Sequence, residues 1–265
     1  MKIKDFVQQL NNWAPLNIAE DYDNVGLLVG NQEETVKKVM VNLEVTEEVL
    51  QEAIDEAANV LLTHHPLWFG KKYHLRGDDW VSRLLLRAIK HNIALVAFHT
   101  NLDNIPAGVN REIGNRLGLN ELQILETKAH NPTGYDVIGS GMIGRLVKPL
   151  GKTDFLRHVQ QVFGTPVLRY ADTEKTEIET VAFCGGSGSF LLESAVAAGA
   201  DAFLTGDITH HTFFDAEGKL LFVDIGHWES EQYTTELMLD FLNNNFANFA
   251  VCKSTVRTNP VNYFS

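Results

Sequence analysis

The sequence predicts an α/β protein made of two similar α/β domains that come from a tandem internal repeat. Short runs rich in β-branched residues alternate with longer helical patterns, which is typical of largely parallel sheets covered by helices. Residues 53–63 also align without a gap on residues 195–205, and each segment ends in an apolar run followed by polar residues. Helix–strand segments rich in Ala and Leu resemble one another by chance as well, so the repeat also depends on the similar strands that flank it.

The alternation of β-branched runs and helical patterns predicts the following strands and helices along the chain. A helix is expected after Thr46, which is a favourable N-cap, with Glu47 and Glu48 in the first turn. Gly164 is expected to end a later helix. Strands are expected at 36–45, 59–65, 93–100, 138–150 and 180–185 and in the run that starts at 220, and helices at 46–58, 81–92, 153–164 and 234–246, with a closing strand and tail at 249–264.

We expect two units along the chain. The first, residues 1–125, carries His64, His65 and Asp103, and the second, residues 126–265, carries a Gly/Ser-rich turn, His227 and Glu231. The boundary is expected in the polar stretch 120–132, where the periodicity lapses. Whether the C-terminal helix packs back on the first unit stays open.

The composition of the chain indicates which kinds of molecule it can bind. The 265 residues are 45% hydrophobic, which supplies material for one large or two modest cores. The formal net charge is −12 and no Lys/Arg run exceeds a pair, which argues against a nucleic acid polymer as partner. A small anionic ligand stays compatible, because a bound metal reverses the local potential.

Targeting signals and cysteine chemistry point to the cytoplasm. The N-terminus lacks a signal-peptide pattern, and no apolar run approaches the roughly 18 to 20 residues of a membrane span. Cys184 and Cys252 match no paired zinc pattern and suit a reducing compartment. We therefore expect a cytoplasmic protein with no membrane partner.

Three clusters of chemically active residues follow apolar runs, where the carboxyl ends of parallel strands collect ligands. The first is His64 and His65 in NVLLTHHPLWFG, directly after an expected strand. An adjacent pair at a strand end can turn both rings toward one cavity, although single histidines are often structural. His74, further along, is expected to be a loop residue and not a ligand.

The second cluster lies in AFHTNLDN at the end of the next strand. Asp103 suits a bridging ligand, because each of its two oxygens can bind a metal ion. The alternative is a turn or helix cap made by Asn101 or Asp103. His99 is expected either to orient a ligand by hydrogen bonding or simply to be buried.

The third cluster places His227 and Glu231 one helical turn apart in GHWESEQ, on one face of a helix start. Such a pair forms half of a metal site, and the alternative is a surface helix with an acidic first turn. Glu229 is expected to be that solvated acid. Two further features are ambiguous. The turn 185–189 can bind a phosphate or merely need glycine. LTGDITHH adds Asp207, His210 and His211 as supporting groups, as part of a subunit contact or as ligands.

Together these clusters resemble the GTP cyclohydrolase I type 2 homologues, the Nif-three-like family of dinuclear metal proteins. The resemblance runs nearly end to end through DNVGLLVG, LTHHPLWF, HTNLDN, the GGSGS turn, LTGDITHH and GHWESE. It implies a dinuclear metal site in the cleft between two α/β domains, and a ring-like homohexamer. The implied ligands of two divalent ions per subunit are His64, His65, Asp103, His227 and Glu231.

The implied ligand set suits zinc, iron, manganese or cobalt and leaves positions for an activated water. We therefore expect a metal-dependent hydrolase of a nucleotide or related heterocycle, with a small nucleotide as ligand and with His99 and His210 as candidates for the general acid or base. Trp68, Phe69 and Trp228 can stack on a base or pack in the core. No guanine-reading or triphosphate motif is present, so a non-catalytic metal carrier or regulator, or a hexameric scaffold stiffened by metal, remains an alternative.

Overall fold

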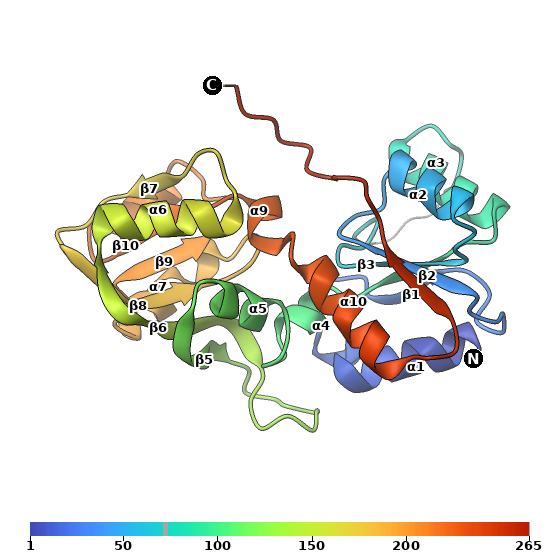
Figure 1. The fold of residues 1–265 in the computed structure, drawn as a ribbon, viewed down its shortest axis with the longest axis horizontal. Coiled ribbons are helices and arrows are strands. Elements are labelled where there is room, and N and C mark those ends of the chain that lie inside the picture. Colours follow the sequence, from blue (N-terminus) through green and yellow to red (C-terminus); the bar gives the residue numbers. More distant parts are fainter. Residues whose placement is uncertain (71–73, 265) are drawn as a thin grey trace. The chain divides into compact units, whose positions relative to one another are not determined.

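The computed structural model describes residues 1–70 and 74–264 and has a mixed α/β fold with two sheets (Figure 1). Contacts divide the chain into two compact units. The first comprises Met1–Leu102 and Thr234–Thr258, and the second comprises Asp103–Tyr233 and Asn259–Ser265. The expectation of an α/β protein is confirmed at this level, and each unit is described by itself below.

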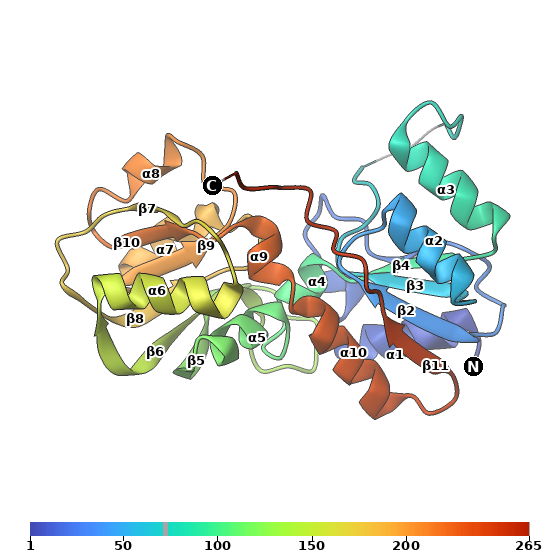
Figure 2. The same ribbon diagram turned by 45° about the horizontal axis from the view of Figure 1, so that its top comes forward.

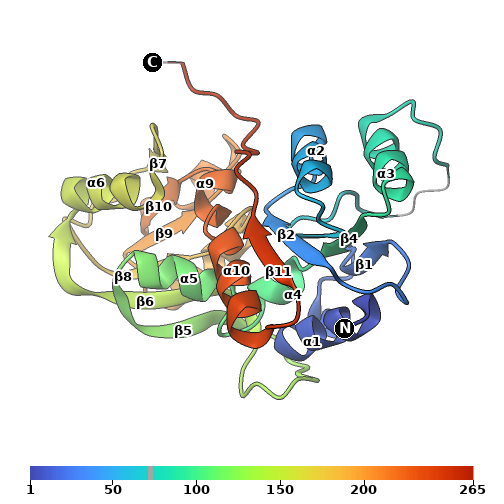
Figure 3. The ribbon, with the colours of Figure 1, turned by 45° about the vertical axis from the view of Figure 1, so that its right-hand side comes forward.

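The first unit contains a five-stranded sheet in the order β1-β4-β3-β2-β11, in which β1 is antiparallel to β4 and the other pairs are parallel. Helices α2 and α3 cover one face, and α1 and α10 lie on the other (Figures 2 and 3). The elements are α1 (Ile3–Trp13), a 3-10 turn (Leu16–Ile18), β1 (Gly26–Val29), β2 (Lys38–Asn42), α2 (Glu47–Asp55), β3 (Val60–Thr63), α3 (Trp80–Lys90), β4 (Ala94–Ala97), α4 (Thr100–Asp103, whose last residue belongs to the second unit), α10 (Thr234–Asn245) and β11 (Ala250–Lys253).

The core of the first unit follows from buried strands and amphipathic helices. Strands β3 and β4 are buried along their whole length, as expected for parallel strands covered on both faces. Met40, Leu61 and Leu95, from β2, β3 and β4, pack against the apolar stripes of α2 and α3. On the other side, Trp13 of α1 stacks on Phe241 of α10 with ring centroids 4.0 Å apart. The central strands are therefore covered on both faces.

The second unit contains a six-stranded sheet in the order β5-β6-β8-β9-β10-β7, with β8, β9 and β10 parallel and the remaining pairs antiparallel. Helix α7 packs against Phe203 and Phe222 on one face. The elements are α5 (Val109–Arg116), β5 (Leu119–Thr127), β6 (Gly139–Gly151), α6 (Lys152–Phe163), β7 (Arg169–Ala171), β8 (Glu177–Phe183), a 3-10 turn (Ser189–Leu191), α7 (Leu192–Ala197), β9 (Ala202–Thr205), α8 (Thr212–Asp215), β10 (Leu221–Asp224) and α9 (His227–Glu231).

Both units contain the same core arrangement. In the first, β2, α2, β3, α3 and β4 follow one another, and in the second β8, α7, β9, α8 and β10 do so, with three neighbouring parallel strands each time. A short helix follows the last of these strands in both, α4 in one unit and α9 in the other. The aligned segments 53–63 and 195–205 occupy matching positions, in which a helix ends and the middle strand follows.

At two helix ends the structure agrees with the prediction from the sequence, and at one strand it differs. The Thr46 hydroxyl accepts a hydrogen bond from the Val49 N–H, as a helix N-cap does. Gly164 ends α6 in the left-handed conformation, with φ of 61°. The polar stretch after residue 119, where we expected the boundary between the units because the periodicity lapses, begins with β5, because β6 pairs along it and leaves its polar side chains largely exposed. None of the helices in the described parts of the chain has the length and apolar character needed to cross a bilayer.

Candidate metal centre

Three histidines of the first unit gather at the carboxyl ends of β3 and β4. His64 and His65 follow the last residue of β3, and His99 follows β4 by two residues. Since β3 and β4 are parallel neighbours, their carboxyl ends meet at one edge of the sheet. We call His64, His65 and His99 the three-histidine cluster. The structure thus confirms the prediction that these residues lie at strand ends.

The rings of the three-histidine cluster are nearly equidistant. The ring centroids lie 4.9 Å apart for His64 and His65, 5.1 Å for His64 and His99, and 5.2 Å for His65 and His99. One ring nitrogen from each residue lies within 4.8 Å of the other two. His64 is fully buried, and the side chains of His65 and His99 are 17% and 13% exposed. Such a compact group of imidazoles suits a divalent transition metal.

Each ring of the cluster uses Nδ1 to contact an oxygen acceptor. His64 Nδ1 donates to the Phe98 carbonyl at 2.9 Å, so its proton sits on Nδ1. His65 Nδ1 lies 3.2 Å from Glu44 Oε1. His99 Nδ1 lies 3.0 Å from both carboxylate oxygens of Asp23. Protonation at Nδ1 leaves the Nε2 lone pair for a metal, the tautomer found in most histidine ligands.

Asp23, the acceptor for His99, was missed in the sequence. Its side chain is fully buried and also accepts hydrogen bonds from the Thr100 N–H at 3.1 Å and the Thr100 hydroxyl at 2.5 Å. Burial alone would raise the pKa of Asp23, but the bonds from His99 and Thr100 outweigh it and lower the pKa to about 2. Asp23 is therefore ionised at neutral pH and holds His99 in place. Its position in DNVGLLVG was the only signal that could have indicated it.

The second unit carries a separate group, which we call the α9 acid cluster, made of Asp207, His227 and Glu231. His227 Nδ1 lies 2.6 Å from Asp207 Oδ2, and its Nε2 lies 3.2 Å from Glu231 Oε2. Glu231 is buried, with only 3% of its side chain exposed. The Glu231 charge raises the pKa of His227 most; burial opposes it and Asp207 adds to it, which brings the pKa to about 11. Two carboxylates around one imidazole thus favour a positive charge, which a proton or a cation can supply.

Asp103 and Cys184 lie close to this cluster in the second unit. Burial raises the pKa of the Cys184 thiol, and the nearby charges of Asp103 and Glu231 raise it further. The Asp103 backbone carbonyl accepts a hydrogen bond from the Asn110 amide at 3.3 Å. The two carboxylates predicted as ligands therefore lie near the same thiol, which stays protonated at neutral pH and is not offered as a thiolate ligand.

The Gly/Ser-rich turn 185–189 supports Glu231 and does not cradle an anion. Three of its N–H groups are already bonded to side chains: Gly185 to Asn110 at 3.0 Å, Gly186 to Ser230 at 2.9 Å and Gly188 to Thr205 at 2.8 Å. Gly186 has φ of 61°, and a Cβ there would lie 2.4 Å from Glu231 Oε1. The turn needs glycine because the carboxylate packs directly against it.

The remaining expected residues divide into buried and exposed ones. Glu229, which we expected to be a solvated acid, is only 3% exposed and accepts a hydrogen bond from the Asn259 amide at 2.8 Å, so that expectation was wrong. His74 is exposed in a loop. His210 is exposed and packs edge-on against His211 and Phe214, and it belongs to no metal-type group found among the described residues.

Exposed aromatic rings border the three-histidine cluster. Phe69 is 53% exposed and its ring centroid lies 5.7 Å from that of His99. Tyr22 is 64% exposed, and its ring lies 6.4 Å from that of Phe69. Trp68 and Trp228 are partly buried. Of the aromatic residues that we expected to stack on a base or fill the core, Phe69 has the exposure that stacking requires.

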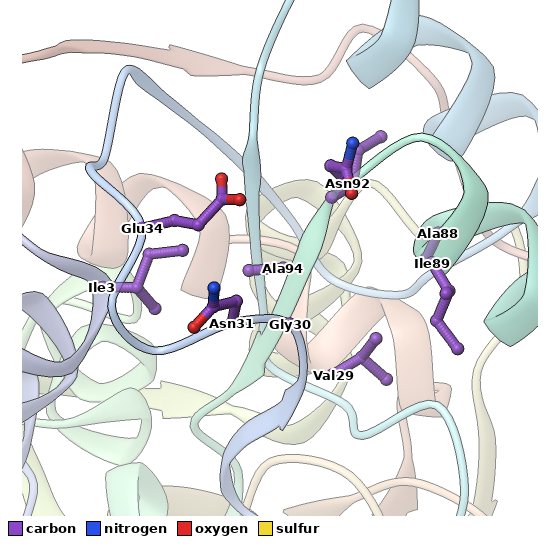
Figure 4. A pocket seen from close by; sticks show the side chains of 10 residues that line it. Ile3, Val29, Gly30, Asn31, Glu34, Ala88, Ile89, Asn92 and Ala94 are labelled. Carbon is purple, nitrogen blue, oxygen red and sulfur yellow. The ribbon is translucent and has the colours of Figure 1, made fainter.

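A different hollow, of about 290 Å³, opens in the first unit between α1, α3, β1 and β4 (Figure 4). Its lining is mostly aliphatic, including Val29, Ile89 and Ile93, with Asn31, Glu34 and Asn92 as polar members. No residue of the three-histidine cluster lines it. This hollow lacks converging ligand atoms, and we do not assign the chemistry to it.

The chain matches a known protein family over nearly its whole length. The model of the Duf34/NIF3 (NGG1p interacting factor 3) family matches residues 1–260. A GTP cyclohydrolase 1 type 2 homolog from Clostridium perfringens is 35% identical over 232 residues, which cover 87% of this chain and 87% of the relative. One from Lactococcus lactis is 31% identical and covers 98% of both chains.

A solved structure has the same fold. The crystal structure of Staphylococcus aureus protein SA1388 superposes with a TM-score of 0.89 and 28% sequence identity, covering 100% of this chain and 99% of that one. The match therefore extends over both sheets.

Proposed function

This chain belongs to the Duf34/NIF3 family, and on that basis we propose that it is a metal-dependent hydrolase of nucleotides or related heterocycles. In this proposal two divalent metal ions bind in each subunit, in the cleft between the two α/β domains. The ligands that we propose are His64, His65, Asp103, His227 and Glu231. The three-histidine cluster is the observation that carries the proposal.

The three-histidine cluster fits a metal because its rings are already oriented for one. Each Nδ1 is engaged with an oxygen acceptor, and a ring nitrogen of every member lies within 4.8 Å of the others. His65 and His99 are partly exposed, and each contacts a carboxylate, Glu44 and Asp23 respectively, so core packing alone does not account for the cluster. A metal also explains why three separate acceptors hold the rings.

The α9 acid cluster fits a metal because of its charge. His227 lies between Asp207 and Glu231, and Glu231 is buried against Gly186. A divalent cation would neutralise these carboxylates more fully than a single proton on His227 does. The five proposed ligands, which are the imidazoles of His64, His65 and His227 and the carboxylates of Asp103 and Glu231, together suit zinc, iron, manganese or cobalt.

Bound divalent metals would supply Lewis acidity and lower the pKa of a coordinated water to near neutral. Phe69, exposed beside His99, would stack on the heterocycle of the substrate, with Tyr22 extending the surface. We assign the proton-transfer role to His99 and not to His210, because His99 belongs to the cluster and Asp23 fixes its ring, whereas His210 packs on a surface phenylalanine.

Metal content and turnover test the proposal together. We expect elemental analysis of the purified protein to find about two transition-metal ions per chain. His64→Ala and Glu231→Gln should reduce this number, and His74→Ala, which removes an exposed loop imidazole, should not. Wild-type protein loaded with the metals found should then hydrolyse at least one member of a nucleotide panel.

Each outcome has a distinct meaning. Two metals with no turnover of any nucleotide would reject the hydrolase and favour a metal carrier, regulator or metal-stiffened scaffold. Absence of bound metal in the wild type after incubation with zinc, iron, manganese and cobalt would reject the centre itself. Loss of metal in His74→Ala to the same extent as in His64→Ala would reject the ligand assignment.

The family resemblance also underlies the proposal of a homohexamer. Light scattering coupled to size-exclusion chromatography should give a mass of about six times the 29.6 kDa of one chain. A monomeric or dimeric mass across the accessible protein concentrations would reject it.

A further inference from the structure

We propose that the C-terminal segment 254–258 positions the metal ligand His65, through a hydrogen bond from Thr258 to Glu44. The inference depends on the proposed metal centre for its consequence, but Thr258, Glu44 and His65 all lie within the first unit. We call residues 254–258 the strap. It follows β11, the edge strand of the sheet.

Glu44 connects the strap to the three-histidine cluster with its two oxygens. Its Oε1 lies 3.2 Å from His65 Nδ1, and its Oε2 accepts a hydrogen bond from the Thr258 hydroxyl. Glu44 lies two residues beyond β2, and Thr258 is 214 positions away in the sequence. The carboxylate is thereby held from both sides, and it can rotate little without losing one of the two bonds.

The strap itself is fixed along its length. The Ser254 N–H donates to the Val41 carbonyl at 2.9 Å, and the Ser254 hydroxyl donates to Glu52. The Thr255 N–H and hydroxyl also donate to Glu52, at 2.9 Å and 2.6 Å. Val256 packs against the core beneath α2 and α3. Thr258 is therefore presented to Glu44 by an anchored chain and not by a loose end.

The same combination of groups occurs a second time in the three-histidine cluster. The Thr100 hydroxyl donates to Asp23, and Asp23 in turn contacts His99 Nδ1. In both places a threonine hydroxyl restrains a carboxylate that restrains an imidazole. Acceptors of this kind fix the tautomer and ring orientation of a ligand and raise its basicity, and removing them typically weakens metal affinity by about 10- to 100-fold.

The residue that follows the strap, Asn259, belongs to the second unit and hydrogen-bonds within that unit. Asn259 donates its side-chain amide to Glu229 of α9, which stands between His227 and Glu231 in the sequence. Two consecutive residues, Thr258 and Asn259, thus hydrogen-bond to an acid beside a proposed ligand, one in each unit. The position of the strap is not explained by core packing alone.

Metal affinity in three matched variants tests the role of Thr258. We expect Thr258→Val, which removes the hydroxyl, to raise the dissociation constant for zinc about 10-fold in a chelator competition assay. Thr258→Ser keeps the hydroxyl and should restore wild-type affinity. Thr255→Val removes an equivalent strap hydroxyl whose partner, Glu52, contacts no histidine, and it should leave the affinity unchanged. The visible spectrum of the cobalt-substituted protein should change in Thr258→Val alone.

Equal zinc affinity in Thr258→Val and Thr255→Val would overturn the inference, because a merely structural strap predicts that result. A second measurement does not depend on metal: crystal structures of metal-free wild type and Thr258→Val. The contact between His65 and Glu44 should persist in the first and be lost or split between rotamers in the second. If no metal binds but this contact changes, the metal centre fails and the positioning role stands; if metal binds and the contact is unchanged, the reverse holds.

Discussion

Replacing Gly186 by alanine should damage the candidate metal centre more than an ordinary glycine substitution. The left-handed backbone at Gly186, with φ of 61°, costs an alanine roughly 1 to 2 kcal/mol. The new Cβ would also lie 2.4 Å from Glu231 Oε1, so the carboxylate must move by about 0.6 Å to restore a 3.0 Å separation. Forcing such overlaps into a packed site typically costs about 1 to 3 kcal/mol more.

Gly199→Ala is the matched control, because Gly199 has φ of 75° and nothing within 4 Å of the added Cβ. Urea unfolding of the metal-free proteins should show a loss of roughly 1 to 2 kcal/mol for Gly199→Ala and roughly 2 to 5 kcal/mol for Gly186→Ala. If Glu231 yields instead, the extra loss appears as weaker metal binding. Equal stability and equal metal content in the two variants would refute the reasoning.

Three further predictions concern charge and capping. The folded-state pKa of Asp23 is lowered to about 2. Its ionised form therefore contributes about 2 kcal/mol to the free energy of unfolding above the ordinary pKa near 4, and this contribution is lost as pH falls toward 2. Asp23→Asn should flatten the acid side of the stability profile measured by urea unfolding. The folded-state pKa of His227 is raised to about 11, so the contribution of its protonated form to the free energy of unfolding is complete below about pH 6.5 and is lost as pH rises toward 11. Metal-free wild type should therefore lose stability over pH 7 to 10. A stability profile that runs parallel to that of His227→Gln over this range would contradict this. Thr46→Ala should lower the free energy of unfolding by about 1 kcal/mol and Thr46→Ser by much less, and identical thermal unfolding of the two variants would show that the cap does not matter.

The sequence predicted those parts of the site that follow from short-range rules. Residues directly after buried strands must emerge at the carboxyl edge of a parallel sheet, and His64, His65 and His99 do so because β3 and β4 are neighbours. His227 and Glu231 approach each other because they are one helical turn apart in α9. In both cases the spacing along the chain determines the distance in space.

The sequence did not predict the acids that hold the histidines of the cluster. Asp23 is 76 positions from His99, and Glu44 is 21 positions from His65. An acid in a polar stretch looks the same whether it is solvated or buried against an imidazole, so local pattern cannot distinguish the two. The prediction that Glu229 is solvated was wrong for the same reason, because Asn259, which donates a hydrogen bond to it, lies 30 positions further along the chain.

The long-range contacts also explain why strand order could not be read from the sequence. β11 pairs with β2 in parallel although more than 200 residues separate their paired positions, and β5 becomes a strand because β6 pairs along it. No short hairpin connects β11 to β2, so their pairing leaves no turn signal in the sequence. Hydrophobic periodicity locates central strands, which are buried on both faces, and is weak for edge strands such as β5 and β11.

The hydroxyl–carboxylate–imidazole arrangement also bears on which histidines remain rigid without metal. Thr100 and Asp23 fix His99, Thr258 and Glu44 fix His65, and a backbone carbonyl fixes His64. A backbone acceptor moves only with its strand, whereas the acceptor of His65 depends on the strap at the end of the chain. Metal affinity should therefore respond to changes in the strap through His65 and not through His64, and a tail that loosens would weaken the centre without unfolding the sheet that carries it.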